Sequence, residues 1–96
     1  MSIGAPRSAN HVDGDVDELV NDLKTSSIDL LQRITAVMSL PQSRRVQSIP
    51  WYKLQIRSMH DVYNGINHKV SSTVAEEVCE GFCKIYQAIY DLEQTL

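Results

Sequence analysis

The segment AEEVCEGFCKIYQAIYDLEQTL, residues 75–96, carries the most regular apolar pattern of the chain. Its apolar residues recur at alternating steps of three and four positions, and they are Ala75, Val78, Phe82, Ile85, Ile89, Leu92 and Leu96. This spacing places them on one face of an α-helix, and such a heptad rhythm is typical of helices that pack lengthwise on other helices. The segment therefore predicts a helix over about residues 73–96 with one side that must be hidden from water.

Two earlier segments repeat the rhythm and predict helices over about residues 15–39 and 49–71. The first apolar stripe is made of Val16, Val20, Leu23, Ser27, Leu30, Ile34 and Val37. The second is made of Tyr52, Ile56, Met59, Tyr63, Ile66 and Val70. Pro41 should end the first helix because it disfavours helical geometry in the residue before it. Ser48 stands as an N-cap for the second helix, with Pro50 in its first turn, where a missing amide hydrogen costs nothing.

The boundary between the second and third helices leaves two alternatives open. Thr73 and Glu76 have the spacing of a capping box, and the heptad register changes there, so a turn near Ser72 is favoured. No glycine or proline enforces that turn, however, and the two helices could also fuse into one rod of about 45 residues. Gly65 adds a further alternative, since Asn64-Gly65 could end the second helix early; the longer helix is the prediction.

These elements predict an all-α fold, either an antiparallel three-helix bundle or a helical hairpin of long heptad-patterned helices that oligomerises. The predicted helix-packing residues are Leu23, Leu30, Ile34, Ile56, Met59, Tyr63, Phe82, Ile85, Ile89 and Leu92. Residues 1–14 contain glycine, proline and polar residues that break any period, so we expect a disordered N-terminal arm before a helical domain of residues 15–96.

Charge is distributed in blocks. The chain has a net charge of −3. By segment, residues 15–38 carry −3, residues 39–72 carry +4 and residues 73–96 carry −4. Antiparallel packing of these segments would bring opposite charges together along the contacts between helices.

The expected compartment is intracellular, cytoplasmic or nuclear. The chain has no apolar run long enough to span a bilayer and no leader-like N-terminus, so we expect no membrane association. Cys79 and Cys83 lie four residues apart on one predicted helix, where a disulfide would need strained geometry. Reduced thiols favour an intracellular compartment.

The sequence predicts neither a metal site nor catalysis. Residue types that bind zinc are present at His60, His68, Cys79 and Cys83. A closed zinc site needs paired ligands at tight spacing, and only the two cysteines have it. Glu76, Glu77 and Glu80 come at the start of a predicted helix, where carboxylates balance the helix dipole without any chemical role. We therefore expect no cofactor and no enzymatic activity.

The region between the first two helices concentrates residue types that dominate protein-binding hot spots. The predicted partner-binding residues are Arg44, Arg45, Trp51, Tyr52, Lys53 and Arg57. They predict a non-enzymatic helical protein–protein interaction module, an adaptor or small subunit of a larger intracellular assembly, which packs with its partners as a homo- or hetero-oligomer. The alternative is a nucleic-acid-associated module that uses the basic and aromatic segment 44–57, against which the net acidity weighs.

Ser48 also resembles an acceptor for a kinase that prefers basic residues, because Arg45 precedes it by three positions. A phosphate there would stabilise the start of the second helix and neutralise the basic segment.

Overall fold

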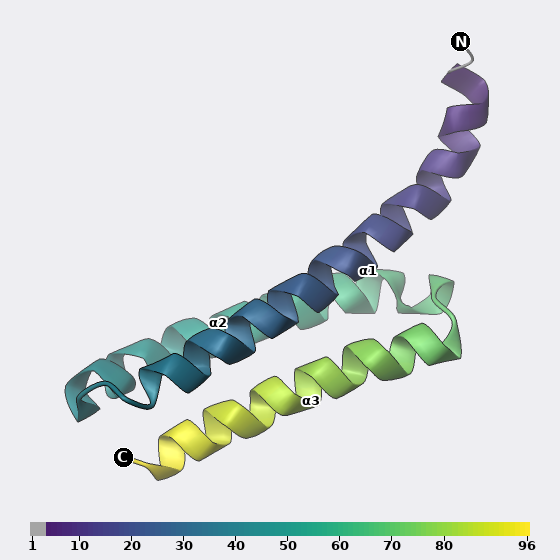
Figure 1. The fold of residues 1–96 in the computed structure, drawn as a ribbon. Coiled ribbons are helices and arrows are strands. Elements are labelled where there is room, and N and C mark those ends of the chain that lie inside the picture. The colour runs from purple at the N-terminus through teal and green to yellow at the C-terminus, as the bar shows by residue number, and fades with distance from the viewer. Residues whose placement is uncertain (1–3) are drawn as a thin grey trace.

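The computed structural model describes the backbone of residues 4–96 and the side chains of residues 15–96. Over this part, the chain forms three α-helices, α1 (Gly4–Val37), α2 (Gln42–Ile66) and α3 (Ser72–Gln94), with a short 3₁₀-helix, η1 (Asn67–Lys69), and no β-strand. Consecutive helices run in opposite directions (Figure 1). Each helix contacts the other two, which confirms the prediction of an all-helical fold whose helices pack on one another.

The core is a single cluster of apolar side chains supplied by all three helices. Its members recur at steps of three, four or seven residues, and they are Val16, Val20, Leu23, Leu30 and Ile34 on α1, Ile49, Tyr52, Ile56, Tyr63 and Ile66 on α2, and Val78, Phe82, Ile85, Ile89 and Leu92 on α3. Met59 is partly buried against this cluster. Burial of these side chains, at about 25 cal/mol per Å², is the main force that holds the bundle together.

α2 begins at Gln42, not near residue 49 as the sequence suggested. Pro41 is the N-cap, and its carbonyl oxygen accepts hydrogen bonds from the backbone amides of Arg44 and Arg45 at 3.0 and 3.1 Å. Ser48 is therefore not the cap: its hydroxyl donates to the Arg45 carbonyl within the helix. Pro50 lies inside α2 on the exposed side, where water can satisfy the carbonyl that loses its helical partner.

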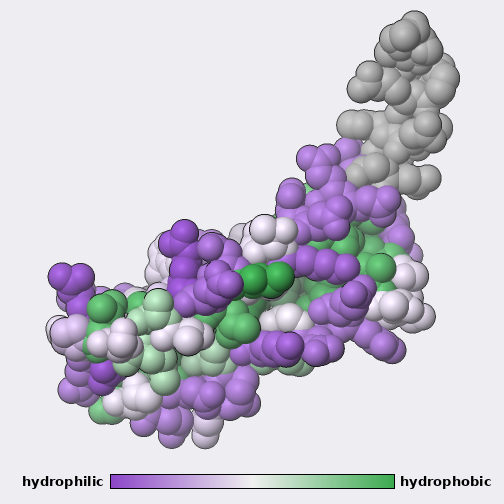
Figure 2. All heavy atoms as spheres, viewed as in Figure 1, coloured by the Kyte–Doolittle hydropathy of each residue, from purple (hydrophilic) through white to green (hydrophobic). Residues whose placement is uncertain are grey.

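The α1–α3 seam is the contact in which Ser27 of α1 faces Gly81 of α3. Ser27 is buried, and its hydroxyl donates to the Leu23 carbonyl at 2.7 Å. A Cβ atom on Gly81 would lie 3.5 Å from the Ser27 Cβ, so two small residues let the helices approach closely. Figure 2 shows this side of the molecule, where hydrophobic residues lie between α1 and α3 with hydrophilic residues around them.

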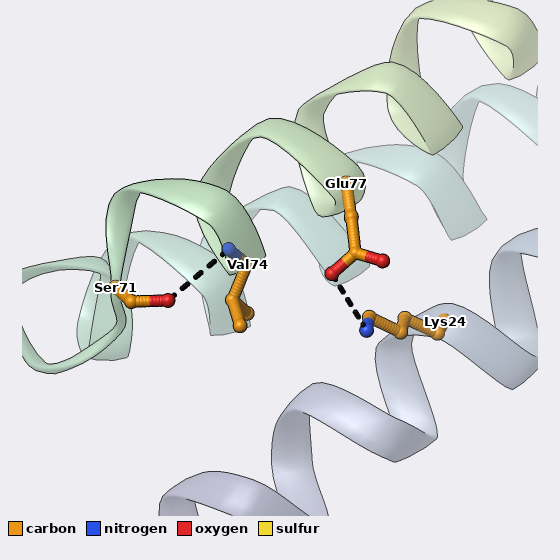
Figure 3. Close-up of polar contacts among 4 residues, drawn as sticks. All are labelled: Lys24, Ser71, Val74 and Glu77. Carbon is orange, nitrogen blue, oxygen red and sulfur yellow. Dashed lines mark hydrogen bonds and ion pairs between the residues drawn. The ribbon is translucent and has the colours of Figure 1, made fainter.

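An ion pair closes the seam one turn away. Lys24 Nζ of α1 lies 3.2 Å from Glu77 Oε1 of α3, and Figure 3 shows the two side chains meeting across the gap between the helices. Both side chains are partly exposed, so the pair contributes on the order of 0.2–1 kcal/mol. The pairing brings an acidic block of the third helix onto a lysine of the first.

A turn separates α2 from α3, so the two helices are not fused into one rod. α2 ends at Ile66, close to the alternative stop at Asn64-Gly65, and η1 covers the next three residues. The N-cap of α3 is Ser71, whose hydroxyl accepts a hydrogen bond from the Val74 amide at 3.2 Å (Figure 3). The capping role predicted for Thr73 therefore belongs to the serine two positions earlier.

Two further expectations concern the ends of the chain and the membrane. The disordered arm predicted at residues 1–14 is not observed over residues 4–14, whose backbone forms the first turns of α1, and residues 1–3 fall outside the described residues. Among the described residues, no helix combines the length and apolar character needed to cross a lipid bilayer.

Candidate protein-binding groove

A groove lies between α2 and α3 and is lined by residues of these two helices. Its volume is about 720 Å³, compared with about 410 Å³ for the depression beside Val16 and Val70 and about 280 Å³ for the depression between α1 and α3 beside Ile28. The depression between α1 and α2 beside Trp51 is smaller still, at about 200 Å³. The residues that line the α2–α3 groove include Pro50, Lys53, Leu54 and Arg57 of α2 and Tyr86, Tyr90 and Glu93 of α3.

Helical spacing explains why these side chains share one surface. Tyr86 and Tyr90 are four residues apart on α3, each one position after a buried isoleucine, so both project beside the core stripe. On α2, Leu54 and Arg57 are three residues apart and lie on the facing side. Leu54 is 60%, Tyr90 56% and Tyr86 47% exposed. The groove thus presents two aromatic rings and one leucine to its surroundings.

The two sides of the groove carry opposite charge. The α2 side is lined by Lys53, Arg57 and Asp61, a net charge of +1. The α3 side is lined by one charged residue, Glu93, a charge of −1. Lys53 Nζ of α2 meets Glu93 Oε2 of α3 at 2.8 Å, which links the two helices across one end of the groove.

The structure separates the residues that the sequence grouped as partner-binding. Tyr52 belongs to the core: it is only 5% exposed, and its hydroxyl donates to the Arg33 carbonyl of α1 at 3.4 Å. Arg45 turns back and donates to the Leu40 carbonyl at 2.6 Å, so it supports the turn between α1 and α2. Within residues 15–96, Arg45 Nε is a buried atom without a hydrogen-bond partner.

The other four predicted residues are exposed but lie on two different sides of α2. Lys53 and Arg57 line the α2–α3 groove. Trp51 lies on the α1 side, 47% exposed, with its ring edge-on to Tyr52 at a centroid distance of 5.4 Å. Arg44 is exposed near the start of α2 and lines neither depression. The basic and aromatic residues of segment 44–57 are therefore not gathered into one patch.

An aromatic cluster lies next to His60, which lines the groove. The Phe82 ring is edge-on to the rings of His60 and Tyr63, at centroid distances of 5.7 and 5.8 Å. Burial raises the pKa of the Tyr63 hydroxyl above its usual value, and a hydrogen bond with Cys79 raises that pKa further.

Cys79 and Cys83 are exposed free thiols. Among the residues that the structure describes, no three His, Cys, Asp or Glu side chains gather where they could hold a metal ion.

The list of partner-binding residues drawn from the sequence omits Leu54, Tyr86 and Tyr90. A signal for the tyrosines is present, because their four-residue spacing widens the apolar stripe of the third helix beyond its core positions. The sequence does not show that this flank faces Leu54 and Arg57, since that depends on how α3 is rotated against α2.

Comparisons with models of known protein families, with curated proteins and with solved structures find no match to this chain.

Proposed function

We propose that this chain is a non-enzymatic helical protein–protein interaction module, a small subunit or adaptor of a larger intracellular assembly. The observation that carries the proposal is the α2–α3 groove, where Leu54, Tyr86 and Tyr90 are 47–60% exposed between a basic and an acidic helix. Aromatic residues and arginine are enriched in the centres of protein interfaces, because each offers a large contact area for little loss of side-chain freedom.

Burial of the apolar side chains of the groove would supply part of the free energy of binding. Full burial of a leucine or aromatic side chain contributes roughly 1.5–3 kcal/mol, and about half of this remains to be gained at residues already half buried. The groove runs from Pro50 to Asp61 on α2, or about 16 Å at 1.5 Å per residue, which is three turns of a docked helix. The charges of Lys53, Arg57 and Glu93 would then select the orientation of the partner.

The character of the groove supports binding without catalysis. Its ionisable groups are spread along an open surface, and Lys53 and Glu93 neutralise each other. Catalytic groups generally act in sites that exclude water. The exposed free thiols of Cys79 and Cys83 support the proposal of a reducing, intracellular compartment.

The alternative proposal is a nucleic-acid-associated module that uses segment 44–57. The net charge of +3 on α2 and the exposed ring of Trp51 favour it. It is weakened because Arg45 is engaged by Leu40 and Lys53 by Glu93, which leaves Arg44 and Arg57 as the exposed arginines of that segment.

The proposal is tested by affinity purification of the tagged full chain, produced together with an untagged copy in its native cells. The variant Leu54→Gln/Tyr90→Gln removes apolar area from the groove while keeping good helix formers. The matched control Leu19→Gln/Ile28→Gln removes two exposed apolar side chains from α1. We expect a protein, either the untagged copy or another, to be recovered with the wild type and the control and lost with the groove variant. Equal recovery by all three would contradict the proposal.

A measurement of nucleic-acid binding tests the alternative function. Arg44→Glu/Arg57→Glu should abolish nucleic-acid binding if segment 44–57 is responsible, and the wild-type affinity should fall steeply as salt rises. The protein-binding proposal predicts instead that the wild type shows no salt-sensitive nucleic-acid binding.

A further inference from the structure

We propose that the α2–α3 groove is occupied by a second copy of this chain, related by a two-fold axis that runs along the groove parallel to the helices. The inference rests on the proposed function and names its partner. Two observations carry it: Lys53 and Arg57 line the α2 side of the groove while Glu93 lines the α3 side, and one ion pair, Lys53 with Glu93, spans the two sides.

The charges of the groove favour one direction of the two-fold axis. A two-fold interface brings the same patch of both copies together, so the patch must be complementary to itself. An axis parallel to the helices exchanges α2 and α3, so Lys53 and Arg57 of one copy lie on the side that Glu93 lines in the other. An axis perpendicular to the helices would instead place α2 on α2, so that the two sides lined by Lys53 and Arg57 would face each other.

The ion pair sets the register of the two copies. Lys53 Nζ and Glu93 Oε2 are 2.8 Å apart, so the two residues lie at the same level along the groove. The parallel two-fold axis keeps every residue at its level, and Lys53 therefore meets Glu93 of the second copy. The result is a ring of four alternating charges, two from each copy.

The apolar residues come together under the same operation. From the level of Lys53 and Glu93, residue numbers rise along α2 and fall along α3. Tyr90 of the second copy, three residues before Glu93, therefore lies at a level between Leu54 and Arg57. The tyrosine ring then covers the leucine, and the guanidinium group of Arg57 can stack on the ring face, a favourable cation–π contact. The two exposed tyrosines of each copy would both be covered by α2 of the other.

The size of the groove sets how much of each helix a dimer would bury. The groove is about 16 Å long and about 20 Å wide at 10 Å per helix, an area of about 320 Å². A standard interface buries roughly 800 Å² per partner, so the dimer would also bury the turns of α2 and α3 on either side of the groove.

The test is a charge exchange followed by sedimentation equilibrium on the full chain. The wild type should sediment as a dimer. Lys53→Glu and Glu93→Lys each place like charges around the ring, so each variant alone should dissociate at least about tenfold more readily, the effect typical of a lost charge pair between proteins. An equimolar mixture should recover the dimer, because each glutamate now faces a lysine of the other copy. The cis double variant Lys53→Glu/Glu93→Lys should also dimerise.

The outcomes are distinguishable. A wild type that stays monomeric up to millimolar concentration overturns the second copy as occupant, while the affinity purification with Leu54→Gln/Tyr90→Gln still decides whether the groove binds another protein. A dimer that Lys53→Glu and Glu93→Lys leave unchanged, or that the mixture fails to restore, shows that the copies meet through another face and also overturns the inference. Circular dichroism of each variant must show wild-type helix content, which excludes a loss of folding.

Discussion

α3 has two neighbours in this bundle, and it meets them in different ways. At the α1–α3 seam, Gly81 has no side chain and faces Ser27, so the helices approach closely, and the ion pair of Lys24 and Glu77 links them one turn away. At the α2–α3 groove, large side chains sit beside the core stripe and keep a wide surface open, with Tyr86 and Tyr90 half exposed. The comparison shows that small residues at a helix contact let two helices approach closely, whereas large residues beside the core stripe border an open groove.

The largest expected effect separates neighbouring residues on α3. Ile85 is 0% exposed and belongs to the core, whereas Tyr86 belongs to the groove. Ile85→Ala should lower the free energy of unfolding by about 2–5 kcal/mol, because it removes buried apolar area and leaves a cavity. Tyr86→Ala should lower it by less than about 1 kcal/mol when folding is measured on the dissociated chain.

Urea unfolding followed by circular dichroism at a low, fixed protein concentration measures both changes, since self-association would otherwise add to apparent stability. A loss for Tyr86→Ala as large as that for Ile85→Ala would show that the groove is part of the folding core and would remove the contrast between the two contacts.

The next effect tests the closeness of the α1–α3 seam. Gly81→Leu should lower the free energy of unfolding by about 1–3 kcal/mol, because a side chain longer than a methyl group is forced against Ser27. Gly65→Leu is the matched control, since a Cβ at Gly65 would meet nothing within 4 Å. This control should raise stability by up to about 1 kcal/mol, the usual cost of a glycine within a helix.

Gly81→Ala sharpens the same point, because its Cβ would make an ordinary contact at 3.5 Å and should be tolerated. Thermal unfolding of the three variants under one condition gives the comparison. If Gly81→Leu is as stable as Gly65→Leu, the seam is looser than described.

The sequence predicts the features of the fold that depend on local helical periodicity, but not those that depend on tertiary contacts. The core stripes follow from helical periodicity alone, which is why Ile34, Ile56 and Leu92 are buried as their spacing suggests. The start of α2 could not be read in the same way, because Ser48 and Pro50 fit a first helical turn as well as an exposed interior turn. What decided between them is Ile49, whose burial against the core is a tertiary effect.

The groove residues could be predicted from the sequence only in part, for a similar reason. Lys53 and Arg57 were expected on a binding surface because of their residue types, and the structure places both in the groove. Tyr52 has the same hot-spot chemistry but lies on the core stripe, a position that the heptad spacing already assigned to packing. The pairing of Lys53 with Glu93 depends on the rotation and offset of α2 and α3, which a single sequence does not encode in any local pattern.

A smaller effect concerns the turn that lets α3 reach both neighbours. Ser71→Ala removes the hydroxyl that accepts the Val74 amide, and it should lower the free energy of unfolding by about 1 kcal/mol. Thr73→Ala, at the position where the sequence suggested a cap, should change it by less than about 0.5 kcal/mol. Urea unfolding of the two variants measures both changes. A Thr73→Ala variant less stable than the Ser71→Ala variant would contradict the assignment of Ser71 as the N-cap of α3.

The smallest effect is a pH dependence in the aromatic cluster beside the groove. Because the pKa of Tyr63 is raised in the folded chain, its contribution to stability is present below the ordinary tyrosine pKa of 10.0 and is lost as the pH rises through the folded value. Tyr63→Phe should therefore make the stability profile flatter above pH 10, and Cys79→Ala should lower the Tyr63 pKa. Ultraviolet titration of tyrosinate, assigned with Tyr63→Phe, checks both, and an unchanged titration in Cys79→Ala would contradict the contact.

The most direct measurement of the central claim is a series of two-dimensional NMR spectra of the full chain recorded over a wide range of concentrations. We expect the signals of Leu54, Arg57, Tyr86 and Tyr90 to shift or broaden together as concentration rises, while those of Ile28 and the Trp51 indole stay unchanged. Shifts centred on Ile28 or Trp51, or no shift at the groove up to millimolar concentration, would contradict the account of a groove that a second copy covers.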